Sequence, residues 1–162
     1  MEEKTEERKK ATIIVISGDF DKLFAAFTIA TGAAAANMDV SMFFTFWGLR
    51  GIKKNMRTGR GLFGRMIGLI EGGDITKANP SKYGFLGIGR WMFGKMMRNK
   101  NVAGLVELRQ LSLDLGVKMY SCETSQEVME IEEKNLIDEV IDTVGVVSMI
   151  KQAQQSEFSY FI

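Results

Sequence analysis

The only thiol in this chain of 162 residues, Cys122, is the side chain best suited to chemistry by type and position. A thiolate is a nucleophile that exchanges sulfur with disulfides and related compounds. Residues 117–121 before it predict a short buried strand. After it, Thr124 suits an N-cap, and Glu127 completes a capping box, so a helix is expected to begin there. Open α/β sheets bind ligands beyond the carboxyl ends of strands, and a helix N-terminus favours the anionic form of a thiol.

Composition excludes several other kinds of catalysis. The chain has no histidine, which excludes Ser-His-Asp and Cys-His catalysis and histidine-ligated metals. A single cysteine excludes an internal disulfide framework and a thiolate zinc cluster. We therefore expect no metal and no cofactor. Free cysteine is also among the most buried residue types, so inert packing remains the alternative role of Cys122.

The elements that would position this thiol are those of an α/β protein. Residues 12–17 form a β-branched run, which predicts a strand covered on both faces. An alanine-rich stretch, residues 21–37, predicts a helix for which Asn37 is a suitable C-terminal cap. Residues 40–46 predict a second buried strand. Together these segments predict a right-handed βαβ unit.

The C-terminal third continues the alternation of helices and strands. Residues 102–115 have apolar residues at helical spacing, with Gly116 as terminator. Residues 136–141 predict a fourth strand, residues 144–155 a helix, and residues 158–162 a final strand. The pattern predicts a three-layer αβα protein with a mostly parallel sheet of about five strands.

The expected domain organisation is a flexible lead-in at residues 1–10 and a single domain at residues 11–162. Within this domain, residues 50–100 predict a long insertion rich in glycine, methionine and basic residues after the second strand. Twelve Lys/Arg face only Glu71 and Asp74 in this insertion, while the rest of the chain is acidic. Helices are expected at residues 62–70 and 88–97. The aromatic residues expected to anchor the insertion are Trp47, Phe63, Tyr83, Phe85, Trp91 and Phe93.

Two glycine-containing patterns resemble nucleotide-binding motifs. Residues 59–64 match G-x-G-x-x-G, but they lie well past the second strand, so we attribute the match to chance or to loop geometry. Residues 89–95 approach a Walker A loop. Met96 replaces the hydroxyl residue that holds magnesium, and no strand precedes the motif, so nucleotide hydrolysis is not expected.

The basic insertion has several possible roles. Its charge can simply balance the acidic remainder of the chain, including across a subunit contact. It can also provide a site for small oxyanions beside Cys122. Binding to a membrane surface or to nucleic acid is a further alternative, because basic helices rich in aromatic residues and methionine can lie at an interface. No apolar run is long enough to predict a membrane span, and residues 1–10 lack the apolar region of a signal peptide.

Several stretches resemble the DsrE/DsrF-like sulfur-transfer family, in particular its prokaryotic branch often labelled peroxiredoxin-like. The likeness begins at residues 17–22 (SGDFDK) and continues through residues 43–49 (FFTFWGL). It includes residues 83–97 and the G-V-K-x-Y-x-C turn that ends at Cys122. Residues 136–138 and 145–146 and the terminal strand extend the likeness over nearly all of the chain after the first ten residues.

This resemblance implies a flavodoxin-like αβα fold that usually forms homo-oligomers. It also implies a cysteine that accepts sulfane sulfur as a persulfide, or thiosulfate as an S-thiosulfonate, and passes it to an acceptor thiol; the matching residue is Cys122. With no second cysteine, the chain suits a cytoplasmic relay better than a peroxidase. The residues expected to support the site are Thr124, Ser125, Gln126, Ser17, Gly18, Asp19, Trp47 and Gly48.

The hypothesis is therefore a sulfur carrier or sulfurtransferase-like protein whose partners are sulfur donors and acceptors, with no nucleic acid. The alternative is a ligand- or partner-binding α/β module with an idle cysteine. Such a module would use the basic insertion, including Lys53, Lys54 and Arg57. A third possibility is peripheral attachment to a membrane through the same insertion.

Overall fold

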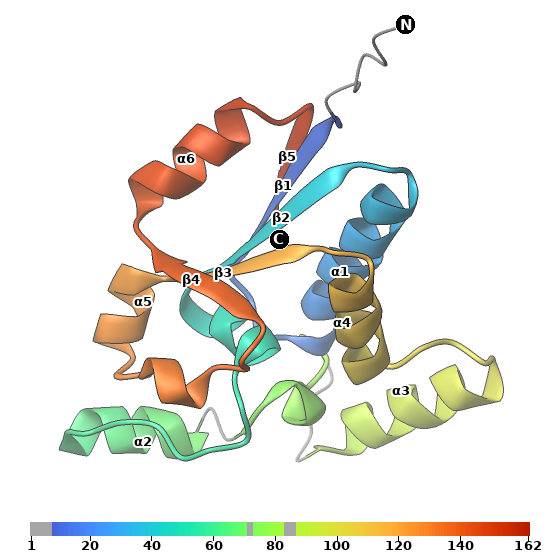
Figure 1. The fold of residues 1–162 in the computed structure, drawn as a ribbon. Coiled ribbons are helices and arrows are strands. Elements are labelled where there is room, and N and C mark those ends of the chain that lie inside the picture. The colour runs from blue at the N-terminus through green and yellow to red at the C-terminus, as the bar shows by residue number, and fades with distance from the viewer. Residues whose placement is uncertain (1–7, 71–72, 83–86) are drawn as a thin grey trace, which may run out of the picture.

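The fold is built on a parallel sheet of five strands. The computed structural model describes residues 8–70, 73–82 and 87–162. The strands are β1 (Lys10–Val15), β2 (Asp39–Phe44), β3 (Lys118–Cys122), β4 (Val140–Val144) and β5 (Phe158–Phe161). Their order in the sheet is β4-β3-β2-β1-β5, and every neighbouring pair is parallel (Figure 1). The predicted parallel sheet is confirmed.

Helices cover both faces of this sheet. Helices α1 (Phe20–Ala35) and α4 (Leu105–Asp114) lie together on one face, and α6 (Val146–Gln154) lies on the other (Figure 1). The short helix α5 (Glu123–Val128) follows β3 directly. Asn37 adopts a positive φ of 64° just after α1, as expected for a residue that ends a helix. The three-layer αβα architecture is as predicted.

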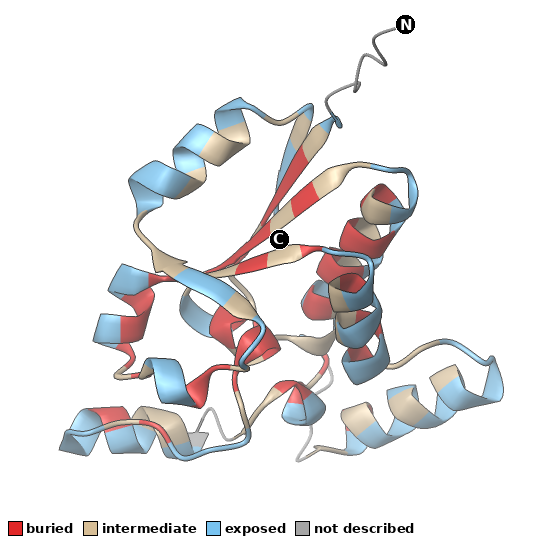
Figure 2. Cartoon of the chain, in the orientation of Figure 1, coloured by how far each residue is buried: buried red, intermediate tan, exposed pale blue. Residues whose placement is uncertain are grey.

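The main core lies between the sheet and α1. Alternating residues of the central strands point toward α1, because successive side chains of a strand point to opposite faces. The fully buried side chains there include Ile13, Met42, Phe44, Leu23 and Phe27, all members of one core cluster. Figure 2 shows buried residues along the central strands and in α1. The rings of Phe27 and Phe44 lie 5.9 Å apart between centroids. This packing fixes the register of β1 and β2 and therefore where each strand ends.

The opposite face of the sheet is thinner and more polar. Helix α6 contains no buried residue, and the segment just after it is joined to the sheet by the hydroxyls of Thr12 and Ser156, 2.9 Å apart. Lys118 and Asp39 form an ion pair at 2.9 Å on neighbouring strands. The apolar residues of α6, such as Val147 and Ile150, are largely exposed.

Helix η1 (Phe46–Ile52) leads into the insertion, whose described residues include the short helices α2 (Leu62–Ile70), η2 (Ile75–Lys77) and α3 (Ile88–Asn99). Helix α2 has the predicted bounds. An antiparallel bridge between Lys53 and Leu136 joins the start of the insertion to the segment before β4. Helices α2 and α3 lie at the same end of the molecule, beyond the sheet in the view of Figure 1. No helix of the described residues is long and apolar enough to span a membrane.

Several sequence-based expectations are wrong in detail. The fourth strand is Val140–Val144 rather than residues 136–141, because the bridge to Lys53 and a turn occupy the earlier residues. Of the expected aromatic anchors, Trp47, Phe63 and Trp91 are 45%, 77% and 61% exposed, so their side chains are not buried. Phe93 is 40% exposed, but its ring lies 6.3 Å from that of Phe20 between centroids, so it does contact α1. The other two, Tyr83 and Phe85, lie outside the described residues, as do residues 1–7 of the expected flexible lead-in.

Candidate functional site

Cys122 lies where a strand passes directly into a helix. It is the last residue of β3 and the N-cap of α5, with an extended backbone at φ −84° and ψ 118°. The predicted capping box is therefore wrong: the helix begins at Glu123, upstream of Thr124, and its N-cap makes no side-chain hydrogen bond. The sheet therefore positions Cys122, and the helix begins at the next residue.

Cys122 is buried, with 7% of its surface exposed, yet it lies outside the main hydrophobic core cluster. Polar residues flank it in sequence. Ser121 is fully buried, and its hydroxyl lies 2.8 Å from that of Thr143 on β4. Ser125 and Gln126 on α5 are 1% and 7% exposed. The thiol thus sits at a polar strand end, but it is not open to solvent as the sequence-based hypothesis required.

A hydroxyl pair joins α5 to the neighbouring strand end. The Oγ1 of Thr45 and the Oγ of Ser125 lie 2.7 Å apart. Phe44 pairs with Ser121 in the sheet register, so Thr45 follows β2 at the same level at which Cys122 ends β3. Sequence reasoning missed Thr45, although it lies inside the FFTFWGL stretch that carried the family resemblance.

The loops after β1 and β2 are locked together by close backbone contact. A Cβ added at Gly48 would lie 2.0 Å from the carbonyl oxygen of Val15, and one added at Gly18 would lie 2.5 Å from that of Trp47. The Gly48 N–H donates to the carbonyl of Ile16 at 2.8 Å. Both glycines are therefore needed because no side chain fits between these loops.

The structure unites only some of the predicted site residues. The Ser17 hydroxyl accepts the N–H of Asp19 at 3.1 Å, which shapes the turn after β1. Trp47 and Thr124 have exposed side chains. Ser125 and Gln126 on α5 are buried, so of the supporting residues that follow Cys122 they are the two that the structure encloses.

A cavity of about 560 Å³ opens beside α5, starting at the residue after Cys122. We call it the acidic groove; its lining includes Glu123, Gln126, Glu127, Glu130, Ile131, Glu132, Glu133, Arg60, Lys134 and Thr143. Five of these residues are glutamates and two are basic. The groove therefore disfavours the small oxyanions that the basic insertion had suggested beside Cys122.

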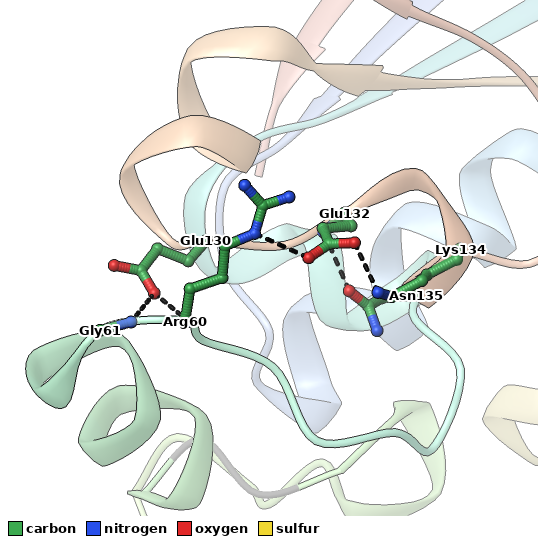
Figure 3. Close-up of polar contacts among 6 residues, drawn as sticks. All are labelled: Arg60, Gly61, Glu130, Glu132, Lys134 and Asn135. Atoms are coloured by element: carbon green, nitrogen blue, oxygen red, sulfur yellow. Dashed lines mark hydrogen bonds and ion pairs between the residues drawn. The ribbon is translucent and has the colours of Figure 1, made fainter.

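Two of these glutamates hold the insertion against the site (Figure 3). The Glu130 carboxylate accepts the backbone N–H groups of Arg60 and Gly61, immediately before α2. Glu132 pairs with the Arg60 Nε at 2.8 Å and with the Lys134 Nζ at 2.6 Å. These hydrogen bonds lower the pKa of Glu130, chiefly through Gly61 and then Arg60. The Arg60 and Lys134 hydrogen bonds lower that of Glu132 to about 2.

This arrangement explains the G-x-G-x-x-G match. A Cβ at Gly59 would lie 2.2 Å from the carbonyl carbon of Gly64, and one at Gly64 would lie 2.2 Å from a Glu130 carboxylate oxygen. The backbone N–H groups of Arg60 and Gly61 bind the Glu130 carboxylate of the same chain in the way that such groups bind phosphate. Loop geometry, as predicted, accounts for the motif.

The basic residues proposed for a ligand-binding module do not form one surface. Lys53 is 2% exposed, and Lys54 pairs with Asp138 at 2.6 Å. Only Arg57 is exposed. No group of three or more Cys, Asp or Glu suited to a metal ion occurs among the residues that the structure describes.

Comparison with known proteins adds evidence from sequence. A model of the DsrE/DsrF/DrsH-like family matches residues 7–161. YrkE of Bacillus subtilis, described as uncharacterized, is 34% identical over 160 residues, which cover 98% of this chain and 99% of YrkE. The sulfur carrier protein DsrE2 of Allochromatium vinosum is 29% identical over 159 residues, with 96% and 99% of the two chains covered.

Among solved structures, the YchN protein of Escherichia coli superposes with a TM-score of 0.58. The match covers 96% of this chain and all of YchN at 11% sequence identity. At this identity the likeness concerns the fold alone, and it supports the flavodoxin-like αβα architecture.

Proposed function

The chain belongs to the DsrE/DsrF/DrsH-like family, and from that membership we propose that it carries sulfur on Cys122 and passes it to an acceptor thiol. The observation that carries the proposal is the position of Cys122, at the carboxyl end of β3 and at the N-cap of α5. The similarity to a sulfur carrier over nearly the full chain supports the same role. A lone thiol remains reduced in the cytoplasm, where we propose that the relay operates.

The transfer needs no oxidant when the donor already holds sulfane sulfur. The Cys122 thiolate attacks the outer sulfur of a donor persulfide; a new S–S bond forms, the donor's S–S bond breaks, and its electron pair leaves with the donor thiolate. With tetrathionate, the same attack leaves an S-thiosulfonate on Cys122 and releases thiosulfate. An acceptor thiolate then attacks the outer sulfur of the Cys122 persulfide and releases the Cys122 thiolate.

Burial of the thiol makes local opening part of this proposal. Helix α5 begins at the residue after Cys122, and its Ser125 is held by Thr45. Loading in this proposal uses a local movement of α5, or its displacement by a partner. We assign Ser125 and Gln126 to positioning of the thiol. We assign no closer role to Thr124, Trp47 or the loop of Ser17.

Intact mass spectrometry tests the proposal. The reduced protein is incubated with polysulfide or with tetrathionate, and the mass is expected to rise by one sulfur atom or by one thiosulfate group. Cys122→Ser is the matched control, since the chain has no other thiol. Absence of an adduct on the wild type, or an equal adduct on the variant, overturns the proposal.

A homo-oligomer is the second part of the proposal. The thin face of the sheet presents exposed apolar residues on two elements, Val146 and Val147 of α6 and Phe161 of β5. Exposed apolar surface of this kind marks contact sites between proteins. Light scattering after size-exclusion chromatography is expected to give a mass above that of one chain, and Val147→Glu is expected to reduce it. A monomer at micromolar concentration contradicts this part.

A membrane surface is the second candidate function, and the exposed faces of α2 and α3 favour it. Leu62, Phe63, Met66 and Leu69 of α2 are 51–80% exposed, and Ile88, Trp91, Met92 and Met96 of α3 are 50–61% exposed. Each set follows helical spacing, and basic residues accompany both helices. Helices of this composition lie in the interface of anionic membranes.

Vesicle co-sedimentation distinguishes this candidate. The protein is expected to pellet with vesicles of phosphatidylglycerol and phosphatidylcholine and to stay in solution with phosphatidylcholine alone. Phe63→Glu is expected to weaken pelleting, whereas Val147→Glu on α6 serves as a control with the same added charge. Failure of the wild type to pellet with anionic vesicles refutes the candidate.

A further inference from the structure

The carboxylates of the acidic groove are not all neutralised by the chain itself. Glu130 and Glu132 are bound by the insertion and by Lys134. No hydrogen bond or ion pair within the described residues reaches the carboxylates of Glu123, Glu127 or Glu133. Three exposed charges therefore face one cavity without a partner, and a cationic ligand would relieve their mutual repulsion.

Gln126 supplies an independent indication of a ligand. Its side chain is only 7% exposed, and its Nε2 lacks a hydrogen-bond partner among the residues the structure describes. It lines the same groove as the three glutamates. A buried donor without an acceptor is unfavourable, so a bound group that offers a carbonyl oxygen to this amide would relieve the cost.

These features match the chemistry of a polypeptide better than that of a simple cation. A lysine- or arginine-bearing segment offers positive side chains for the glutamates and a main-chain carbonyl for the Gln126 amide. Ile131, 5% exposed, gives the groove an apolar surface for the aliphatic stems of such side chains. The volume of about 560 Å³ is in the range of sites that enclose a few residues.

From these observations we infer that the acidic groove binds a basic segment of the protein that exchanges sulfur with Cys122. The inference rests on the proposed function for the identity of that partner. Glu123 is the residue after Cys122, so a segment in the groove lies at the first turn of the helix that begins beside the thiol. Binding there brings a partner's thiol to Cys122 and presses on the element that must open.

Fluorescence anisotropy with a defined probe tests the groove. The probe is a fluorescein-labelled peptide of alternating lysine and glycine, and its glutamate–glycine counterpart is the negative probe. The basic peptide is expected to bind the wild type and the Cys122→Ser variant equally. Because this readout needs no thiol chemistry, its failure is separate from failure of sulfur loading in the mass experiment.

Variants assign the binding to the groove. Glu123→Gln/Glu127→Gln/Glu133→Gln is expected to weaken binding at least about tenfold. The matched control, Asp114→Asn/Glu139→Gln/Glu157→Gln, removes the same charge elsewhere and is expected to change it less than about twofold. Equal effects of the two triple variants overturn the inference, because the peptide would then respond only to net charge.

Gln126→Met separates a peptide site from a site for any cation. Methionine keeps the length of the side chain and removes the amide donor, and thermal unfolding checks that the variant is folded. It is expected to weaken the lysine–glycine peptide but not spermine, which has no carbonyl, in competition assays. Undiminished peptide binding by the folded variant overturns the role of Gln126 and the polypeptide assignment.

Discussion

The hydroxyls of Thr45 and Ser125, 2.7 Å apart, connect the end of β2 to the helix that begins beside Cys122. Thr45 follows the strand that pairs with β3, and Ser125 lies in the first turn of α5. This contact therefore holds the first turn of α5 against the end of β2. It also predicts what happens to the thiol when the contact is lost.

Ser125→Ala is expected to lower the free energy of unfolding by about 1–2 kcal/mol, because the Thr45 hydroxyl loses its partner beside a side chain that is 1% exposed. Guanidinium denaturation gives the value. Thr124→Ala, an exposed neighbour on the same helix, is the control and is expected to cost less than about 0.5 kcal/mol. Equal costs for both variants would contradict a specific role of the hydroxyl pair.

Cys122 is expected to react with Ellman's reagent at least about tenfold more slowly in the native protein than in guanidinium, because it is 7% exposed and needs local opening. Ser125→Ala is expected to increase the native rate, since it loosens α5. Stopped-flow absorbance measures both rates. A native rate equal to that of the unfolded chain would show that the thiol is already accessible.

Gly48→Ala is expected to destabilise the protein by about 1–3 kcal/mol, because the new Cβ would lie 2.0 Å from the Val15 carbonyl oxygen and the two loops must separate. Gly32→Ala is the matched substitution. Gly32 is an exposed residue of α1, and nothing lies within 4 Å of a Cβ added there. Gly32→Ala is therefore expected to stabilise the protein by about 0.5–1 kcal/mol. Thermal and denaturant unfolding of both variants checks the opposite signs.

Glu132 makes stability depend on pH in the acidic range. Its pKa is about 2 in the folded protein, against 4.5 ordinarily, because of its bonds with Arg60 and Lys134. A depressed folded pKa contributes stability above pH 4.5 that is lost as the pH falls from 4.5 toward 2. Glu132→Gln and Arg60→Gln are both expected to flatten the curve of unfolding free energy against pH in that window. An unchanged slope in both variants would refute the contribution.

The core elements were predictable because their signals are local. The β-branched run of β1 is typical of a buried strand, and the alanine-rich sequence of α1 is typical of a helix. The apolar residues of α4 recur at helical spacing, which predicts the face that it buries. The position of Cys122 at a strand end also followed from the residues around it. The N-cap did not, because the sheet carries the chain to Cys122 itself and the helix begins before Thr124 can cap it.

Contacts between residues far apart in the chain could not be predicted from the sequence. Glu130 and Gly61 are far apart in the chain, and no spacing rule joins a glutamate after α5 to the glycines before α2. The Thr45–Ser125 pair likewise depends on sheet register. The five glutamates between residues 123 and 133 were a visible signal of an acidic surface, but only the fold shows that they share one groove.

The carboxylate of Glu130 has a mechanical consequence. It holds the backbone just before α2, and Glu130 lies only two residues after the end of α5. Any pull on α2 must either break those hydrogen bonds or drag the end of α5 with it. The helix that follows Cys122 is thus tethered to a helix whose apolar side chains are exposed, and a partner that moves α2 also strains the helix beside the thiol.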